Sequence, residues 1–517
     1  MNITRRCFTR ALPAAGVSFA ASAGAQTASP FRHGVASGDP LPNRVILWTR
    51  VTPSTGEDFV PVEWQMAEDP AMNRVVQRGL TYTNPGFDYT VKVDVTRLNP
   101  GVTYYYQFSV RGALSPVGRT RTLPLGAVDR FRAAVCSCSN FPYGFFNAYR
   151  MIANRADLDC VIHLGDYIYE YGNAQYGDGT RINRVPAPDR EITTLADYRQ
   201  RYAQYRSDPD LQEAHRQHPW IVVWDDHESA NDAWAEGAQN HTPASEGDWN
   251  VRRAVATQAW FEWLPVRENP FLDGLIYRTF RIGGLADLIM LDTRLAGRSQ
   301  QVEPNSPALA DPNRTLLGGR QESWFFQELS ASQARGARWR LVGQQVMMGQ
   351  LLGTDGNPFN TDQWDGYLAS RGRLLQHLGA GSIQNVAVLT GDIHSSWGNE
   401  ITANPFLPSG YTSQAVEFVT PAITSPGIDD RAQANALQAQ IAATHPHVKY
   451  VELFRRGYLL LDIDRDRIQG EWYHVRTITE RAAQEELGRV LASAAGEAKL
   501  ASAQVSDARR NPPPPAP

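Results

Sequence analysis

The chain has 517 residues, of which 42% are hydrophobic and 20% are charged, as in an ordinary soluble globular protein. This length predicts two or three domains with a large core. The formal net charge of −4 lacks the basic excess that nucleic-acid binding requires, and we expect no nucleic-acid-binding domain.

The first 26 residues are typical of a signal peptide. Arg5-Arg6 and Phe8 precede an alanine-rich apolar stretch, and Ala23-Gly24-Ala25 supplies a cleavage site. The arginine pair favours a twin-arginine signal over a general secretory leader, so we expect the twin-arginine export machinery as a partner. No later run reaches the roughly 20 apolar residues that a membrane span needs. We therefore expect a periplasmic or secreted mature protein without a transmembrane segment.

Cysteine usage argues against a disulfide framework. Only Cys136, Cys138 and Cys160 follow the signal peptide. An exported chain of this size with so few cysteines, in an odd number, is not held together by disulfides. We expect Cys136 and Cys160 to be inert buried thiols.

Residues 31–123 have the texture of a small all-β domain. Short alternating or β-branched runs are separated by turn signals such as Asn99-Pro100-Gly101. This spacing predicts a β-sandwich of immunoglobulin or fibronectin type, followed by a short linker at 124–128.

Residues 129–475 read as a larger α/β domain. Apolar strands with polar carboxyl ends alternate with helical spacing at 144–154, 197–208, 248–264 and 321–336. Two stretches rich in Gly, Pro and Asn, at 172–192 and 298–319, predict long loops over the strand ends, where pockets are usually built.

Four apolar strands in this domain end in side chains of the kind that bind metals. In open α/β sheets ligands collect at the carboxyl ends of the strands, and the four ends therefore predict one polynuclear metal site. The four stretches end in Cys136-x-Cys138, Gly165-Asp166-x-x-Tyr169, Asp225-Asp226-His227-Glu228 and Gly391-Asp392-Ile393-His394.

These residue types suit hydrolysis at phosphorus. A carboxylate such as Asp166 can bridge two ions roughly 3.5–4 Å apart, and a tyrosine ligand favours Fe(III). His227 suits either a general acid for the leaving oxygen or a clamp on the transition-state charge, and orienting a ligand is the plainer alternative. Arg294 follows another apolar strand and either grips phosphate or forms a structural ion pair. His163 lies on a strand and is expected in the core or behind the ligands.

Taken together, the motifs GDYIYE, WDDHE, GDIHSSW and Cys-x-Cys, with the opening HGVASGDPLPNRVILWTRVTP, resemble the alkaline phosphatase D (PhoD-like) family of metallophosphoesterases. The resemblance implies a calcineurin-like layered β-sandwich with flanking helices, preceded by the all-β domain. It also implies one Fe(III) held by Cys138, Asp166, Tyr169 and His394. One or two Ca²⁺ ions would lie beside it, with Asp166 bridging and with Asp226 and Asp392 as further ligands. A histidine ligand of the wider superfamily is missing, and residues 342–345 (VGQQ) are its expected counterpart.

The expected activity is that of a phosphoric ester hydrolase acting on phosphomonoesters, phosphodiesters or both by attack of a metal-bound hydroxide. The expected catalytic residues are His227, Asp166 and Arg294. One alternative is a phospholipase D-like phosphodiesterase acting on lipids or teichoic-acid-like polymers. Another is a metal-dependent binding module of the cell envelope that has lost catalysis.

The carboxyl end is rich in Ala, Glu and Arg, with Leu487, Leu491 and Leu500 at helical spacing. This pattern predicts a helix within 480–510, a possible lid over the site. The proline-rich residues 511–517 predict an extended, disordered tail.

Overall fold

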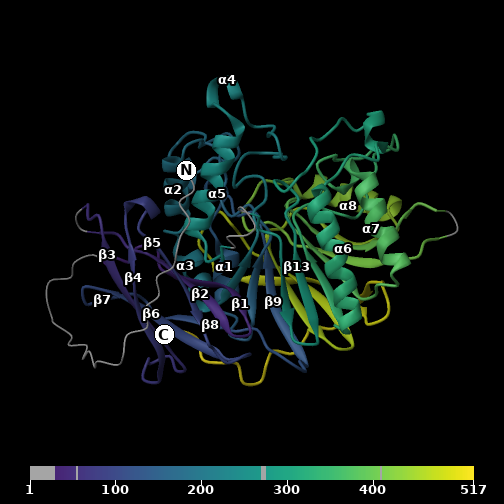
Figure 1. Cartoon of the computed structure of the whole chain (residues 1–517). Helices are drawn as coiled ribbons and strands as arrows, with labels where there is room; N and C mark the ends of the chain where they lie inside the picture. The colour runs from purple at the N-terminus through teal and green to yellow at the C-terminus, as the bar shows by residue number, and fades with distance from the viewer. Residues whose placement is uncertain (1–28, 54–55, 269–274, 408–409) are drawn as a thin grey trace.

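The computed structural model describes residues 29–53, 56–268, 275–407 and 410–517. The signal peptide expected at residues 1–26 lies outside this part of the chain. Two large β-sheets share one hydrophobic core, which contains Ala133 and Leu461 of one sheet together with Leu341 and Ala387 of the other. Helices cover the outer faces of the pair (Figure 1). The α/β layered architecture expected from the sequence is confirmed.

The first sheet has ten strands in the order β22-β21-β20-β19-β9-β10-β11-β1-β2-β5. Its middle strands β9, β10, β11 and β1 run parallel, and β10 and β11 are buried along their whole length. Parallel strands are covered on both faces, which is why they read as continuous apolar runs in the sequence. The strands are β1 (Val35–Leu41), β2 (Arg44–Arg50), β5 (Thr90–Thr96), β9 (Arg130–Cys136), β10 (Cys160–His163), β11 (Pro219–Val222), β19 (Gly457–Asp464), β20 (Arg467–Val475), β21 (Glu485–Ala494) and β22 (Ala501–Ser502).

The second sheet has seven strands in the order β12-β13-β14-β15-β17-β16-β18. Here β13, β14, β15 and β17 run parallel to one another. Their carboxyl ends therefore meet along one edge, as those of the first sheet do. The strands are β12 (Arg278–Ile282), β13 (Ala286–Met290), β14 (Trp339–Gly343), β15 (Val386–Thr390), β16 (Ser396–Ile401), β17 (Ala415–Val419) and β18 (Val448–Glu452).

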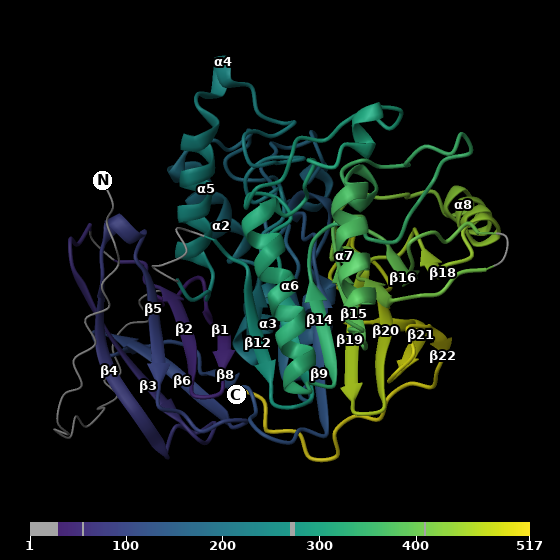
Figure 2. The same ribbon diagram turned by 45° about the vertical axis from the view of Figure 1, so that its right-hand side comes forward.

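Eight α-helices lie in the described ranges, and the four helical stretches expected from the sequence correspond to α1, α2, α5 and α6. Residues of α1, α2, α3 and α5 join the core that the two sheets share, whereas α6 and α7 join a separate core on the seven-stranded sheet (Figure 2). No helix in the described ranges combines the length and apolar character needed to cross a membrane. The helices are α1 (Asn147–Ala153), α2 (Leu195–Tyr205), α3 (Pro209–Gln217), α4 (Pro243–Glu246), α5 (Trp249–Trp263), α6 (Gly318–Arg335), α7 (Leu368–Ala380) and α8 (Arg431–Thr444).

The amino-terminal region is all-β, as expected, but it is joined to the main body through a sheet. A smaller sheet packs on β1, β2 and β5 around a core that includes Val45, Val62, Val93 and Tyr106. Strand β1 pairs with β2 on one side and with β11 on the other, where Ser37 lies opposite Pro219. Half of the amino-terminal sandwich therefore continues the ten-stranded sheet. The smaller sheet contains β3 (Val60–Ala67), β4 (Val75–Thr83), β6 (Thr103–Val110), β7 (Ala113–Leu114) and β8 (Gly118–Arg121).

The prediction of a helix within residues 480–510 is wrong. This segment forms β21, which pairs antiparallel with β20, and the short β22, which forms the sheet edge. Val490 and Leu491 of β21 are buried, while Leu487 is exposed. The open backbone edge of β20 and its apolar neighbours outweigh the helix propensity of an Ala- and Glu-rich sequence. At the edge of the sheet, this segment is not a helical lid over the site.

The tail at 511–517 is extended as expected, but it is not disordered. The hydroxyl of Tyr105 donates a hydrogen bond to the Pro514 carbonyl at 2.6 Å, and Arg119 Nη1 donates one to the Pro513 carbonyl at 3.1 Å. The backbone N–H of Ala516 donates to Gln217 Oε1 at 2.9 Å. Proline lacks an N–H but keeps its carbonyl, so buried donors of the folded body can hold a proline-rich segment.

Candidate active site and metal centre

The candidate ligands gather where the parallel strands of both sheets end. Cys138 follows β9, Asp166 follows β10, and Asp226 follows β11, all from the ten-stranded sheet. Asp392 and His394 follow β15 of the seven-stranded sheet. The site thus lies at the shared carboxyl edge of the two sheets, where ligands of α/β folds collect.

The turns that carry these ligands are strained. The backbone φ angles of Cys138, Asp166, Asp392 and His394 are 61°, 55°, 63° and 59°, in the left-handed region that side-chain-bearing residues rarely occupy. Gly165, with φ 107°, permits the turn, because a Cβ there would meet Asp225 at 2.4 Å. Such strain is costly and is typical of functional sites.

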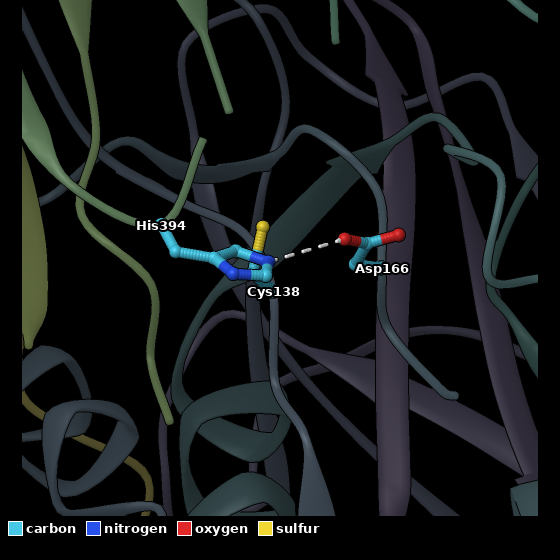
Figure 3. A group of neighbouring side chains, drawn as sticks. All are labelled: Cys138, Asp166 and His394. Atoms are coloured by element: carbon cyan, nitrogen blue, oxygen red, sulfur yellow. Dashed lines mark ion pairs between the residues drawn. The ribbon is translucent and has the colours of Figure 1, made fainter. Parts of the chain in front are cut away.

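Cys138, Asp166 and His394 form the first group of potential ligands. Their ligand atoms lie within 4.8 Å of one another, and Figure 3 shows the three side chains pointing toward one point. The hydroxyl of Tyr169 donates to Asp166 Oδ2 at 3.0 Å and lies 3.2 Å from His394 Nε2. The fold therefore brings together the four residues expected to hold iron.

Hydrogen bonds orient these side chains toward the centre. His394 Nδ1 lies 2.7 Å from the Pro426 carbonyl, an acceptor, so Nδ1 donates there and Nε2 faces the centre. Ser425 contacts the Tyr169 oxygen through its hydroxyl. Asp166 Oδ1 is buried and has no hydrogen-bond partner in the described part of the chain. A buried acceptor that lacks a partner at such a point fits a cation ligand.

Two further ligand groups adjoin the first. Asp166, Asp226 and His227 form one, and Asp225, Asp226 and Asp392 form the other. Asp166 belongs to the first two groups and Asp226 to the last two, so carboxylates link all three. This is the arrangement that bridged cations need. Asp225 was not among the residues expected as ligands, although it lies in the same acidic run as Asp226.

The electrostatics of the site favour cations. Burial, together with Asp166 and other carboxylates, holds the pKa of the Cys138 thiol well above its usual value, and burial with Asp166 and Cys138 does the same to Tyr169. Burial and the neighbouring acids, against the opposing effect of Arg294, raise the pKa of Asp392 to about 8. Without metal ions, these three side chains thus keep their protons, which bound cations would displace.

Arg294 contacts the acidic side of the site. Its Nε donates to Asp225, its Nη1 donates to both oxygens of Asp362 at 2.8 and 2.7 Å, and its Nη2 donates to Asp392 Oδ1 at 2.8 Å. The guanidinium is fully buried. These contacts match the ion-pair alternative for Arg294, because carboxylates take the donors that would grip a phosphate. Asp362 lies on a loop without a recognisable motif, and no sequence signal pointed to it.

His227 is held by a residue whose role the sequence did not reveal. Its Nδ1 donates to Glu170 Oε2 at 2.7 Å, and Glu170 Oε1 accepts from the Asn231 backbone N–H at 2.8 Å. The imidazole packs on the Tyr169 ring at a centroid distance of 4.2 Å. Burial lowers the pKa of His227, but Asp226 and Glu170 more than offset this and raise it well above the usual value. In the metal-free protein these acids therefore favour the imidazolium form of His227, with Nε2–H left to donate.

Glu228 and the two glutamines after β14 support the site without supplying ligands. Glu228 accepts backbone N–H bonds from Asp166, Tyr167 and Asp225 at 3.0, 2.7 and 2.8 Å, which ties the ends of β10 and β11 together. Gln345 donates to the Trp224 and Leu291 carbonyls and accepts from Thr293. Gln344 is also fully bonded, to Val346, Thr390 and Trp364. Residues 342–345, the expected counterpart of the missing histidine ligand, thus stabilise the site through hydrogen bonds.

The remaining polar candidates lie in the core. Cys136 and Cys160 are buried, and in the described part of the chain all three cysteines are free thiols. His163 Nε2 bonds the Tyr149 hydroxyl at 2.9 Å, and its ring stacks on Trp220 at 5.7 Å between centroids. Burial lowers the pKa of His163 to about 3, so it is a neutral core group.

Comparisons with known proteins agree with this geometry. Residues 133–472 match the family model described as PhoD-like phosphatase, and residues 18–124 match that of the PhoD-like phosphatase N-terminal domain. Alkaline phosphatase D of Bacillus subtilis (strain 168) is 38% identical over 473 residues, which cover 88% of this chain and 79% of that protein. A solved structure titled "Structure of PhoD" superposes with a TM-score of 0.85 at 34% identity, covering 94% of this chain and 95% of the other. The chain therefore belongs to the PhoD-like phosphatase family and is a phosphoric ester hydrolase.

Proposed function

We propose that the protein is an exported, metal-dependent phosphoesterase that hydrolyses phosphomonoesters, phosphodiesters or both. The observation that carries this proposal is the chain of three ligand groups at the converging strand ends, joined through Asp166 and Asp226. His227 lies within one of these groups, but as an imidazolium it has no lone pair for a metal, and a binding module without catalysis would not need such a proton donor there.

The donor set suits two kinds of cation. Cys138, Tyr169 and His394 offer sulfur, phenol and imidazole, which with Asp166 suit iron. Asp225, Asp226 and Asp392 offer only oxygen, which suits Ca²⁺. Bound there, such ions would supply Lewis acidity and lower the pKa of a water so that it attacks phosphorus.

The chain's own residues would then assist the leaving group. His227 is protonated, and Glu170 holds it through Nδ1, so its Nε2–H is free to protonate the departing ester oxygen. Arg294 acts as a positioning residue, since its Nε and Nη2 donate to Asp225 and Asp392 and fix where both carboxyl groups lie. Asp166 belongs to two of the ligand groups and would therefore help to hold both cations.

Export by the twin-arginine route is the localisation that we propose. The supporting observation is the Arg5-Arg6 pair ahead of an alanine-rich stretch. Changing both arginines to lysine should leave the protein in the cytoplasm of a host with that route. Continued export of the double-lysine variant would contradict the proposal.

The proposed function is tested by metal analysis together with a paired ester assay. The purified mature protein should retain iron and hydrolyse a chromogenic monoester or diester, or both. Calcium should support the activity and a chelator should abolish it. A metal-free protein that hydrolyses both esters equally well with and without chelator would overturn the proposal.

A further inference from the structure

A cavity of about 720 Å³ lies beside the candidate metal centre, and His394 is part of its wall. Its volume is in the upper part of the range of small-molecule pockets and far exceeds the needs of a phosphate group. The wall also includes Ile393, which precedes His394, and Gly427, which follows the carbonyl that His394 bonds. The cavity and the metal centre thus share one wall.

The lining is mainly apolar. Among the described residues that form it, none is Asp, Glu, Lys or Arg. Helix α8 contributes Leu437, Gln440, Ile441 and Thr444, which share one face of the helix at spacings of three and four residues. The large apolar side chains of the lining are Leu351, Leu352, Phe359, Ile393, Trp397, Phe406, Ile428, Leu437, Ile441 and Leu453.

Several polar groups of the lining already have partners within the protein. Thr444 Oγ1 donates to the Gln440 carbonyl at 2.8 Å, and His445 Nε2 accepts from the Leu352 backbone N–H at 3.1 Å. Ser395 Oγ donates to the Ile393 carbonyl at 3.0 Å and accepts from Trp397 Nε1 at 2.8 Å. A sugar or a second phosphate would find few free donors here, whereas a hydrocarbon needs none.

The segment between β14 and α7 supplies an exposed aromatic side chain to the wall. Phe359 is 68% exposed although it belongs to the lining, and the backbone of this segment folds back on itself where Gly353 N–H donates to the Asn357 carbonyl at 2.8 Å. Phe359 thus adds apolar surface to the wall of the cavity.

We propose that this cavity binds an extended alkyl chain carried by the phosphate ester, with the phosphoryl group at the metal centre. This inference rests on the proposed function and specifies its substrate class as esters that carry an uncharged hydrocarbon group. His394 belongs both to the metal centre and to the wall of the cavity. The phosphoryl group would therefore lie at the metal centre, and the alkyl chain would extend from it into the cavity.

Binding of n-alkylphosphonates tests this directly, since they are not hydrolysed. Affinity for the metal-loaded protein, measured by calorimetry below the micelle concentration, should rise from the butyl to the octyl compound. Each added methylene that becomes buried should tighten binding by up to about fourfold. With n-alkyl p-nitrophenyl phosphodiesters, which share one leaving group, KM should fall along the same series while kcat changes little.

Substitutions on α8 supply the matched controls. Leu437→Gln, which adds a polar amide to the lining, and Ile441→Trp, which narrows the cavity, should flatten the dependence on chain length and leave the affinity for methylphosphonate unchanged. Ala436→Gln, at an exposed position of the same helix outside the lining, should keep the full dependence.

The possible outcomes separate this inference from the proposed function. Activity on short esters with no chain-length dependence in the wild type would overturn the inference and leave the proposed function standing. The same dependence in Leu437→Gln, Ile441→Trp and Ala436→Gln would also overturn it. Absence of hydrolysis with every ester would count against the proposed function, while tighter binding of longer phosphonates would still support the cavity.

Discussion

Tyr169 illustrates how much at the residue scale depends on a single turn. Three residues beyond Asp166, its hydroxyl contacts Asp166, His394 and Ser425 at once. A tyrosine that merely packed under a loop would not place its oxygen among potential ligands. The positive φ of Asp166 turns the chain so that carboxylate and phenol face the same point.

The first prediction concerns the iron ligands. Cys138→Ala and Tyr169→Phe should each reduce iron content, and each should weaken or shift a visible thiolate- or phenolate-to-iron absorption band. Activity should fall by roughly 100-fold or more, in keeping with losses of metal-site side chains. Iron analysis and a visible spectrum provide the measurement. Cys160→Ala is the control, because this thiol is buried outside the three ligand groups. A band unchanged in both ligand variants would contradict the assignment.

The second prediction concerns Glu170. In Glu170→Gln the negative charge that raises the pKa of His227 is removed while the side-chain shape is kept. His227 should then lose its proton at a lower pH, so the alkaline limb of the kcat profile should move to lower pH. A profile of kcat against pH measures this shift. Glu191→Gln, at a carboxylate that pairs with Arg252, should leave the profile in place. Equal profiles for wild type and Glu170→Gln would show that His227 is not the acid.

At the scale of elements, β21 shows why a local pattern can mislead. Its residues have helical spacing of leucine and good helix propensity, but β20 offers an unpaired edge next to a buried core. Propensities amount to tenths of a kcal/mol per residue, less than the combined gain from pairing and burial. Strand pairing therefore decides the structure of this segment.

The third prediction tests the role of β21. Val490→Pro removes a backbone donor where Val490 pairs with Glu471, and it should destabilise the fold by about 1–3 kcal/mol. The melting temperature should fall by several degrees, and kcat/KM at 25 °C should not rise. Thermal unfolding and a steady-state assay provide the two measurements. Increased activity with an unchanged melting temperature would instead indicate a lid.

At the scale of the whole molecule, the site joins two sheets that have separate strand orders but share a core. Backbone hydrogen bonds such as Ile423 N–H to the Ser137 carbonyl, at 3.0 Å, already link them next to the site. Asp225 and Asp226 belong to one sheet and Asp392 to the other, and Arg294 bridges them. Cations held between these carboxylates would add to the link. Metal binding should therefore stabilise the whole fold by mass action.

The fourth prediction gives this link a pH dependence. In the metal-free protein, burial raises the pKa of Asp392 and Glu228 to about 8, above their unfolded values of roughly 4. A raised folded pKa contributes stability that is complete below the unfolded pKa and is lost as pH rises through about 8. The melting temperature of the metal-free protein should thus fall between pH 5 and 9. Added calcium should raise it most at the alkaline end, where fewer protons need displacing. A stabilisation by calcium that shrinks as pH rises would contradict this account.

Much of the molecule followed from the order of residues alone. Buried parallel strands are continuous apolar runs, and the polar residues that end them are conspicuous. Cys138, Asp166, Asp226, Asp392 and His394 could therefore be predicted to meet. The amino-terminal β-region and helices α1, α2, α5 and α6 were visible from turn signals and helical spacing.

Other features depended on contacts between segments far apart in the chain. Arg294 is drawn toward Asp225, Asp362 and Asp392 because the ends of β11, β13 and β15 and a loop converge there. Glu170 became a partner of His227, β1 joined β11, and residues 485–494 became a strand for the same kind of reason. A sequence displays local periodicity and the chemistry of each side chain. Long-range pairing, burial and the apolar cavity beside His394 arise only when the separate segments compete for the same edges and the same core.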